Sequence, residues 1–399
     1  MEIPLNRQIG ENMTNKSFAT KFLGMCILLA LCSVCVFAEA KKYEPVTEKT
    51  ITEDGVMLPG YTYPYKWNSE ISGDPVLFEE VWGYVMISRL KDYDDETPLT
   101  DVGLFAAEVN SYGELTNVPK RSAVGTKFKG RVHLVTICES TSLSHFCIDP
   151  KYGVRDKIVE GLLEAVEEFD GLQVDWELIP GRDADNFYSF LKELKKGLGK
   201  KPLTVCVPAR TKTLKQDVYS YEKIGKIADR IMIMAYDEHW TGGPAGSIAS
   251  MDWCEKIADY AKTVWPANKY IFGLPFYGRI WGNKSVKQAL AFNGMNRTAH
   301  ENNVVTIERE RGVPHYNYTV SVDVEGWYED AYSIVERSRM YKKMGYKCIA
   351  FWRMGQEDVA VWDWIGNKKT GTDPLTEQIG IKALEEKEEE KNEATEKVR

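Results

Sequence analysis

The chain has 399 residues, which is enough for one large domain or two ordinary ones. Hydrophobic residues make up 43% of it and aromatic residues 12%, so the composition indicates a globular protein with a large core. A net charge of -8 at pH 7, without any run of Lys or Arg, argues against a nucleic-acid-binding protein.

The N-terminal segment has the pattern of a secretory signal peptide. Lys16 and Lys21 precede an apolar run, Phe22 to Leu31, and small residues follow it, so we assign residues 1–38 to the signal. Met13 is a candidate true start, since it would bring the basic residues close to the terminus. The run is too short for a stable membrane span. We expect a secreted, periplasmic or cell-surface protein; a lipid anchor is less favoured, because bulky residues precede the cysteines here.

Short apolar runs with the composition of strands begin after a polar, proline-containing lead-in at residues 39–78. There are eight of these strand candidates: Glu80–Met86, Val102–Asn110, Arg131–Cys138, Leu172–Glu177, Leu203–Ala209, Arg230–Tyr236, Tyr270–Tyr277 and Lys347–Arg353. Most of these strand candidates are separated by segments whose apolar residues have helical spacing. These segments are Gly153–Glu168, Asp185–Leu198, Ser220–Ala228, Met251–Val264 and Ala331–Met344.

Strands that alternate with helices predict an α/β fold. Eight such units match a (β/α)8, or TIM, barrel, which we place over residues 79–375. An open doubly wound sheet is the competing architecture, but no glycine-rich phosphate loop supports it. Residues 281–325 exceed a barrel loop and contain alternating runs at Val304–Ile307 and Tyr316–Val320, which predict a small β insertion between strands 7 and 8. Residues 376–399 form a mixed-charge tail.

Five cysteines follow the signal segment, so at least one of them stays free. Cys138 and Cys147 are close enough in sequence to form a bridge. Cys206 and Cys348 lie in apolar strand patterns, where a buried small hydrophobic residue is expected. This part of the chain has no CxxC motif, and its histidines lack ligand spacing, so the sequence predicts no metal site.

The strand around residues 172–177 carries the clearest chemical pattern. Because side chains alternate along a strand, Gln173, Asp175 and Glu177 share one face, opposite an apolar face. A half-solvated antiparallel strand would give the same alternation. In a barrel, however, the two acids would lie at the carboxyl end of the fourth strand, where barrel enzymes place catalytic groups. Two neighbouring acids repel, so one can keep its proton while the other is ionised.

Several segments together resemble glycoside hydrolase family 18. Asp170–Glu177 is similar to the family signature D-G-x-D-x-D-x-E, except at Gln173. Further similarity to the family's motifs on strands 6, 7 and 8 lies at Met234–Asp237, Gly273–Arg279 and Phe351-Trp352. Within the family, Tyr236–Trp240 and Phe351–Asp358 resemble the spore-germination and cortex-lytic N-acetylglucosaminidase type. The likeness spans residues 80 to 365 in the expected order.

The resemblance implies a retaining, substrate-assisted hydrolysis of β-linked N-acetylglucosaminyl bonds. Glu177 would be the general acid and base. Asp175 would orient the 2-acetamido group, whose oxygen is the nucleophile, and Tyr236 would hydrogen-bond that group. Trp352 would stack on the sugar, and Gln173, Asp237 and Arg279 would complete the substrate-binding residues. Tyr236 and Trp352 would otherwise be read as core residues of apolar strands.

Gln173 is the departure from the family pattern, which more often has a carboxylate there. An amide can hydrogen-bond Asp175 but cannot take up its charge, so we expect a simpler pH profile with a more acidic lower limb.

The favoured substrate is peptidoglycan, with chitin or another glycan of this type as the alternative. No cofactor is implied, and we expect a monomer without nucleic-acid partners. Two other classes of function stay open. A sugar-binding lectin would keep the barrel but lose the acid, whereas Glu177 is present. A structural or interaction barrel is the third possibility.

Overall fold

The computed structural model describes residues 71–285 and 289–368. The predicted signal peptide (1–38), most of the predicted lead-in (39–78) and the predicted tail (376–399) lie outside these residues. Among the helices within them, none combines the length and apolar character that a membrane crossing requires.

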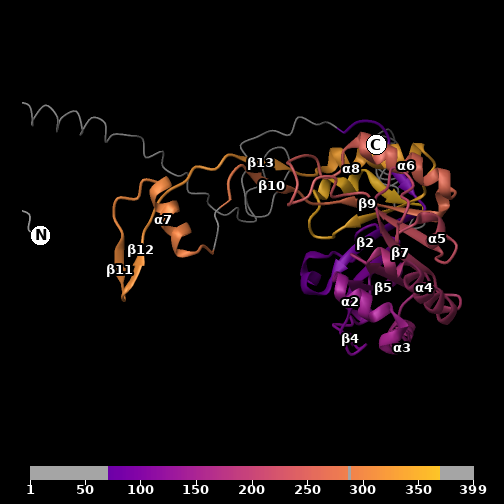
Figure 1. The fold of residues 1–399 in the computed structure, drawn as a ribbon. Coiled ribbons are helices and arrows are strands. Elements are labelled where there is room, and N and C mark those ends of the chain that lie inside the picture. The colour runs from indigo at the N-terminus through magenta and orange to yellow at the C-terminus, as the bar shows by residue number, and fades with distance from the viewer. Residues whose placement is uncertain (1–70, 286–288, 369–399) are drawn as a thin grey trace, which may run out of the picture. The chain divides into compact units, whose positions relative to one another are not determined.

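Eight parallel strands form a closed barrel (Figure 1). β2 pairs with β3 as well as with β14, and these pairings close the sheet. The strands are β2 (Glu80–Met86), β3 (Asp101–Val109), β5 (Arg131–Cys138), β6 (Gly171–Trp176), β7 (Leu203–Pro208), β8 (Arg230–Met234), β9 (Tyr270–Pro275) and β14 (Cys348–Trp352). The predicted (β/α)8 barrel and its eight strands are therefore confirmed. Each predicted strand end agrees with the observed end to within two residues.

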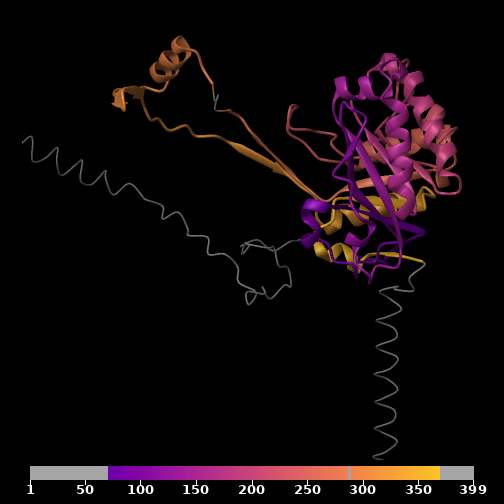
Figure 2. The ribbon, with the colours of Figure 1, turned by 90° about the horizontal axis from the view of Figure 1, so that it is seen from below.

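Helices cover the outside of this barrel (Figures 1 and 2). In α4 the side chains of Phe187, Phe190, Leu191 and Leu194 are fully buried, as expected for an amphipathic helix packed on a sheet. The α-helices are α2 (Thr141–Ile148), α3 (Arg155–Ala165), α4 (Ala184–Leu198), α5 (Tyr221–Gly225), α6 (Met251–Val264), α7 (Phe292–Glu301) and α8 (Ala331–Lys343). Neither α2 nor α7 was predicted. The 3-10 helices are η1 (Ile87–Asp92), η2 (Arg121–Val124), η3 (Pro150–Tyr152), η4 (Val166–Glu168), η5 (Gly181–Asp183), η6 (Ala267–Lys269) and η7 (Val359–Asp363).

Two short strands, one before the first barrel strand and one after the last, pair with each other. β1 (Val76–Phe78) pairs in parallel with β15 (Ile365–Asn367), and Phe78 is fully buried. The end of the predicted lead-in is thus part of the packed structure rather than a surface segment. β4 (Leu115–Thr116) adds an antiparallel edge to β3.

The predicted insertion between barrel strands 7 and 8 is present, but its predicted strands are wrong. β10 (Arg279–Gly282) pairs with β13 (Val324–Trp327), and β11 (Glu308–Glu310) pairs with β12 (Val313–His315). The predicted runs Val304–Ile307 and Tyr316–Val320 flank this second hairpin as irregular chain. Their alternation does not bury a face, because Val305 is 98% exposed.

A buried charge cluster fills the end of the barrel where the strands begin. Asp101 is fully buried and accepts hydrogen bonds from Arg131 and from Thr100 Oγ1 at 2.6 Å. Its Oδ1 lies 2.8 Å from His133 Nε2. Glu80 pairs with both Arg131 and Arg230 at 3.0 Å. Burial alone would raise the pKa of Asp101, but His133 and Arg131 outweigh it and lower that pKa.

We predict that Asp101→Ala lowers the free energy of unfolding by about 3–5 kcal/mol, because it removes the buried carboxylate to which His133, Arg131 and Thr100 are hydrogen-bonded. Since the pKa of Asp101 is lowered in the folded state, its contribution is present above its unfolded pKa and is lost as the pH falls. Urea denaturation at pH 7 measures the change. Asp259→Ala, at an exposed position of α6, is the matched control and should change stability by at most about 0.5 kcal/mol. Equal stability of the two variants would contradict the prediction.

Candidate active site

Gln173 and Asp175 project from β6 into the barrel interior. β6 pairs in parallel with β5 and β7, so the alternative of a half-solvated antiparallel strand is wrong. The register partners of Gln173 and Asp175 on β5 are Val135 and Ile137. Both partners belong to an interior apolar cluster with Tyr84, Phe105 and Met232.

The opposite face of β6 packs under the helices. Leu172, Val174 and Trp176 belong to the main hydrophobic core, and Trp176 lies 5.0 Å from Phe190 of α4 between ring centroids. Trp176 Nε1 also donates a hydrogen bond to Thr136 Oγ1 at 3.2 Å. Asp170, just before β6, accepts hydrogen bonds from Val132 N at 2.8 Å and from Arg121 at 3.1 Å, so it braces the start of the strand.

Asp175 is only 8% exposed, and its Oδ1 has no hydrogen-bond partner in the described part of the chain. Burial, and then the negative charge of Glu177, raise the pKa of Asp175 to about 7. A thiol interaction with Cys206 opposes this rise only in part. Asp175 can therefore hold a proton near neutral pH.

Glu177 directly follows β6, and its backbone N–H donates to Cys138 O at 2.9 Å. Burial, followed by the charges of Glu139 and Asp237, raises the pKa of Glu177. The pKa of each acid of the signature is thus raised, and the protonation of one affects the other.

The Gln173 amide is buried, and neither of its atoms makes a hydrogen bond of ordinary geometry. The hydrogen bond that an amide at this position could make to Asp175 is therefore not formed. The Tyr84 hydroxyl is likewise unpaired and lies near this amide. Burial raises the pKa of Tyr84 well above its usual value, although the neighbouring amide opposes this rise. Buried polar groups without partners are uncommon and gather at functional sites.

Tyr236 and Trp352 flank the acids from other strands. Tyr236 follows β8 opposite Gly273, where a Cβ would come within 2.9 Å of the tyrosine ring. Glycine at that position therefore makes the room for Tyr236. Trp352 ends β14 and is partly buried, with its ring 4.6 Å from Phe105 and 5.5 Å from Tyr84. Both side chains stand at the end of the barrel that carries Glu177.

Asp237 and Arg279 form an ion pair at this same end. Asp237 Oδ1 accepts from Arg279 Nη2 at 2.6 Å and Nε at 3.0 Å, and from Tyr277 Oη at 2.6 Å. Asp237 has a φ of 59°, a left-handed conformation that Asp tolerates better than most residues. Tyr277, which looks like a core residue in the sequence, thus belongs to the polar site, whereas Phe276 is core and stacks on Phe351 at 4.5 Å.

Glu139 is a site residue that the sequence did not point out. It follows Cys138, the register partner of Trp176, so it stands beside Glu177 across neighbouring parallel strands. Its charge raises the pKa of both Asp175 and Glu177. The available signal was its place directly after a predicted strand, at the same end of the barrel as the two acids.

All five cysteines of the described residues are buried and free. The possible Cys138–Cys147 bridge is therefore not formed, and Cys206 and Cys348 are buried as expected. One group in the described residues, His145, Asp149 and Asp183, brings possible metal-ligand atoms within 4.8 Å of one another. His145 Nδ1 lies 2.8 Å from Asp183 Oδ2, and Asp149 pairs with Lys151 at 2.9 Å, so the group already has protein partners.

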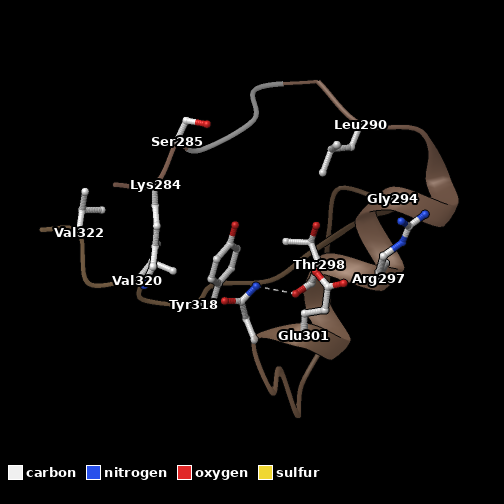
Figure 3. A pocket seen from close by; sticks show the side chains of 11 residues that line it. Lys284, Ser285, Leu290, Gly294, Arg297, Thr298, Glu301, Tyr318, Val320 and Val322 are labelled. Atoms are coloured by element: carbon white, nitrogen blue, oxygen red, sulfur yellow. Dashed lines mark hydrogen bonds between the residues drawn. The ribbon is translucent and has the colours of Figure 1, made fainter. Parts of the chain in front are cut away.

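Cavities in the described residues lie both within the insertion and beside the barrel strands. Figure 3 shows one of about 540 Å³ within the insertion, where Lys284, Arg297, Glu301 and Tyr318 are among the lining residues. Asn302 donates a hydrogen bond there to Thr298 O at 2.8 Å. The lining contains neither Asp175 nor Glu177. Another, of about 610 Å³, lies beside the carboxyl ends of β2, β3 and β5, next to the site itself.

Comparison with known proteins identifies the family. The model described as Glycosyl hydrolases family 18 matches residues 155–357, just over half of the chain. The chain belongs to glycosyl hydrolase family 18. The matched range contains every predicted site residue, from Gln173 to Trp352.

Among family 18 relatives, the uncharacterized glycosylase YvbX of Bacillus subtilis (strain 168) is 29% identical over 211 residues, which cover 48% of this chain and 59% of that protein. The cortical fragment-lytic enzyme of Bacillus anthracis is 26% identical over 217 residues, covering 51% of this chain and 50% of that enzyme. The chain thus spans about half the length of these relatives.

Solved family structures share the fold. The spore cortex-lytic enzyme SleL of Bacillus cereus superposes with a TM-score of 0.58 at 22% identity, over 79% of this chain and 80% of that one. A chitinase from Chromobacterium violaceum gives a TM-score of 0.54 at 23% identity, covering 71% and 96% of the two chains.

We predict that Asp175 titrates near pH 7 instead of at its usual 3.8. Carbon-13 NMR of the labelled side-chain carboxyls would measure this. Glu177→Gln should lower the pKa of Asp175 by about one, because it removes the like charge but leaves the burial. Glu164→Gln, an exposed substitution on α3, is the control and should leave the titration unchanged. An ordinary carboxyl titration of Asp175 would show that the interior does not hold its proton.

Proposed function

We propose that this chain is a secreted or cell-surface glycosidase that cleaves β-linked N-acetylglucosaminyl bonds with retention of configuration. The observation that carries the proposal is the pair Asp175 and Glu177, each with a raised pKa. They lie at the end of the barrel where the strands finish, which is called its mouth below. A raised pKa lets a carboxyl keep its proton to higher pH, which suits Glu177 to act as the general acid. Family membership supports the same reaction class.

In the first step, Glu177 donates its proton to the glycosidic oxygen as the bond to the anomeric carbon breaks. The substrate's 2-acetamido oxygen attacks that carbon and forms a cyclic oxazolinium, so no enzyme nucleophile is needed. Asp175 in its ionised form accepts a hydrogen bond from the acetamido N–H and stabilises the positive charge, so the reaction requires a pH at which this carboxyl has lost its proton. Water then opens the ring, and Glu177 takes the proton from that water.

Other side chains would hold the sugar in place. Tyr236 would donate a hydrogen bond to the acetamido oxygen, and Trp352 would stack under the ring. Asp237 uses one oxygen for Arg279 and Tyr277. Its second oxygen and the Arg279 guanidinium would bind sugar hydroxyls. The uncommitted Gln173 amide would hydrogen-bond Asp175 once the substrate positions that carboxylate.

Peptidoglycan is the favoured polymer because the chain resembles the cortex-lytic type of the family. Chitin is the alternative, since the similar proteins include a chitinase as well as cortex-lytic enzymes. The remaining alternative function is a sugar-binding lectin. Two neighbouring carboxyls with raised pKa values are an arrangement that binding alone does not require, and they favour the enzyme.

We predict that the chain releases new reducing ends from N-acetylglucosamine oligomers or purified peptidoglycan, and that Glu177→Gln reduces the rate by about 100-fold to 10,000-fold. The amide keeps the shape of the side chain but cannot donate the proton. Glu164→Gln is the matched control. Full activity of Glu177→Gln would rule out the mechanism, and tight binding without any release would indicate the lectin.

A second prediction concerns Gln173→Asp. The added carboxylate next to Asp175 should raise the pKa of Asp175 further, so the acidic limb of the pH–rate profile should move to higher pH by about one. The unaltered chain is therefore the more acid-tolerant of the two. Profiles of kcat/KM between pH 4 and 9 measure the shift, and identical profiles would count against the role given to Gln173.

A further inference from the structure

A column of unpaired polar atoms lies in the barrel interior beneath Asp175. Five buried side chains contribute to it, and within the described part of the chain these atoms have no hydrogen-bond partner: Asp175 Oδ1, both amide atoms of Gln173, Thr204 Oγ1, Tyr84 Oη and His133 Nδ1. A buried donor or acceptor without a partner is costly, so such atoms are normally few and scattered. Their concentration here indicates that small polar molecules bind between them, and water is the one that protein interiors commonly hold.

Strand register gives the order of these groups along the column. Thr204 on β7 is the register partner of Gln173 on β6. Gly171, two residues earlier on β6, is the register partner of His133 on β5. Side chains alternate along a strand, so positions 171, 173 and 175 share the inward face of β6. The column therefore begins at Asp175 and ends at His133. The four steps from Gly171 to Asp175 span about 13 Å, at about 3.3 Å per residue.

The imidazole of His133 presents a base to this column. Its Nε2 lies 2.8 Å from Asp101 Oδ1, and an ionised carboxylate only accepts hydrogen bonds, so Nε2 carries the hydrogen. In the neutral ring, Nδ1 then holds a free lone pair. A Cβ at Gly171 would come within 2.5 Å of Nδ1, so glycine is needed there and Nδ1 lies against the strand that carries Asp175. Trp82 stacks on the imidazole at 4.2 Å between centroids and fixes its plane.

Asp175 has to give up a proton before it can stabilise the oxazolinium. Its pKa is raised to about 7, so the protonated form is abundant at neutral pH. Bound substrate would cover the mouth and leave the interior as the direct route for this proton. The Gln173 amide is not a base, and the Thr204 hydroxyl can only pass a proton on. An imidazole is a base near neutral pH, and the Asp101 carboxylate would stabilise the imidazolium of His133.

We propose that ordered water in this column connects Asp175 with His133, and that His133 takes up the proton of Asp175 when substrate covers the mouth. The O–H bond of Asp175 breaks, each water and the hydroxyls of Thr204 and Tyr84 accept one proton and pass one on, and an N–H bond forms at His133 Nδ1. No other reactant is needed, and the proton returns after the product leaves. His133 acts through Asp175 and does not touch substrate, so it is a positioning residue. The inference rests on the proposed function and extends it to the fate of this proton.

Titratable and charged groups face both ends of the column. Those around Asp175 are Glu177, Glu139, Cys206, Tyr84 and Tyr236. Those around His133 are Asp101, Glu80, Arg131 and Arg230. The acids at the mouth oppose the ionisation of Asp175, whereas the two anions and two cations around His133 balance one another. Substrate therefore has to drive the transfer, through its acetamido N–H and the positive charge of the oxazolinium.

Nitrogen-15 NMR of the histidine side chains in the full chain tests the proposal. The ligand is an N-acetylglucosamine tetramer with sulfur in place of its glycosidic oxygens, which resists cleavage. At pH 6, below the pKa of about 7 of Asp175, saturation with this ligand should move His133 Nδ1 from the unprotonated to the protonated range. Carbon-13 NMR should show that Asp175 becomes ionised in the same sample. The His133 signals are those that persist when each other histidine is replaced by Gln: His145, His239, His300 and His315.

Two results of this measurement would overturn the proposal. One is an Nδ1 that stays unprotonated in the saturated complex, whether or not Asp175 becomes ionised. The other is an Nδ1 that is already protonated in the free chain at pH 6, because it could then accept no proton from Asp175.

Thr204→Val interrupts the column with little change of shape. It should leave the affinity for the thio-linked tetramer within about twofold, abolish the protonation of His133 on binding, and lower kcat on the oxygen-linked tetramer about tenfold with little change in KM. Ser338→Ala is the matched control, since it removes another buried and unpaired hydroxyl, on α8 outside the barrel, and it should change none of these values. Thermal unfolding verifies that each variant is folded. If Thr204→Val does not fold, Tyr84→Phe should give the same pattern, with Tyr341→Phe on α8 as its control. An unchanged kcat together with an unchanged Nδ1 response would overturn the proposal.

Hydrolysis of the oxygen-linked tetramer by the unaltered chain keeps this proposal separate from the proposed function. Cleavage without protonation of His133 in the thio-linked complex would overturn the proton transfer and leave the glycosidase intact. Protonation of His133 on binding without any cleavage would support the proton transfer and contradict the glycosidase.

Discussion

The burial of the Asp175 carboxyl beside Glu177 is the constraint around which the site is built. A barrel interior excludes water, so an acid placed there keeps its proton unless protein groups compensate. In this molecule they compensate little: Oδ1 has no partner, the Gln173 amide beside it is unpaired, and the nearest charges are negative. The surrounding barrel tolerates that cost because its core and its network of charges at the opposite end hold the strands in register.

The opposite end shows how differently the same fold treats another buried acid. Asp101 is also fully buried, but Arg131 and His133 neutralise it and lower its pKa. Close partners thus keep Asp101 ionised, whereas the burial of Asp175 without such partners raises its pKa. This contrast supports the proposal that proton transfer takes place at the end that carries Asp175 and Glu177 and not at the end where the strands begin.

Much of the fold follows from local patterns, since apolar runs and helical spacing located all eight barrel strands and five helices. The helix α2 was missed because its sequence, Thr141–Ile148, has apolar residues without a clear helical face. The insertion was misread at Val304–Ile307, where alternation lacks a sheet to pack on. Among site residues, the acids and Tyr236, Asp237, Arg279 and Trp352 could be named through family motifs. Glu139 and Tyr277 could not, because their importance depends on strand register and on a hydrogen bond between distant segments.

The pairing of β1 with β15 determines from which side this domain can be attached to a support. Lys368 N donates to Phe78 O, and Asn367 donates to Pro98 O just before β3 begins, so both strands attach where the barrel strands start. A linker fused to either strand therefore leaves from the side opposite Asp175 and Glu177. Coupling the domain to a solid support through these strands would keep its mouth turned towards an insoluble polymer.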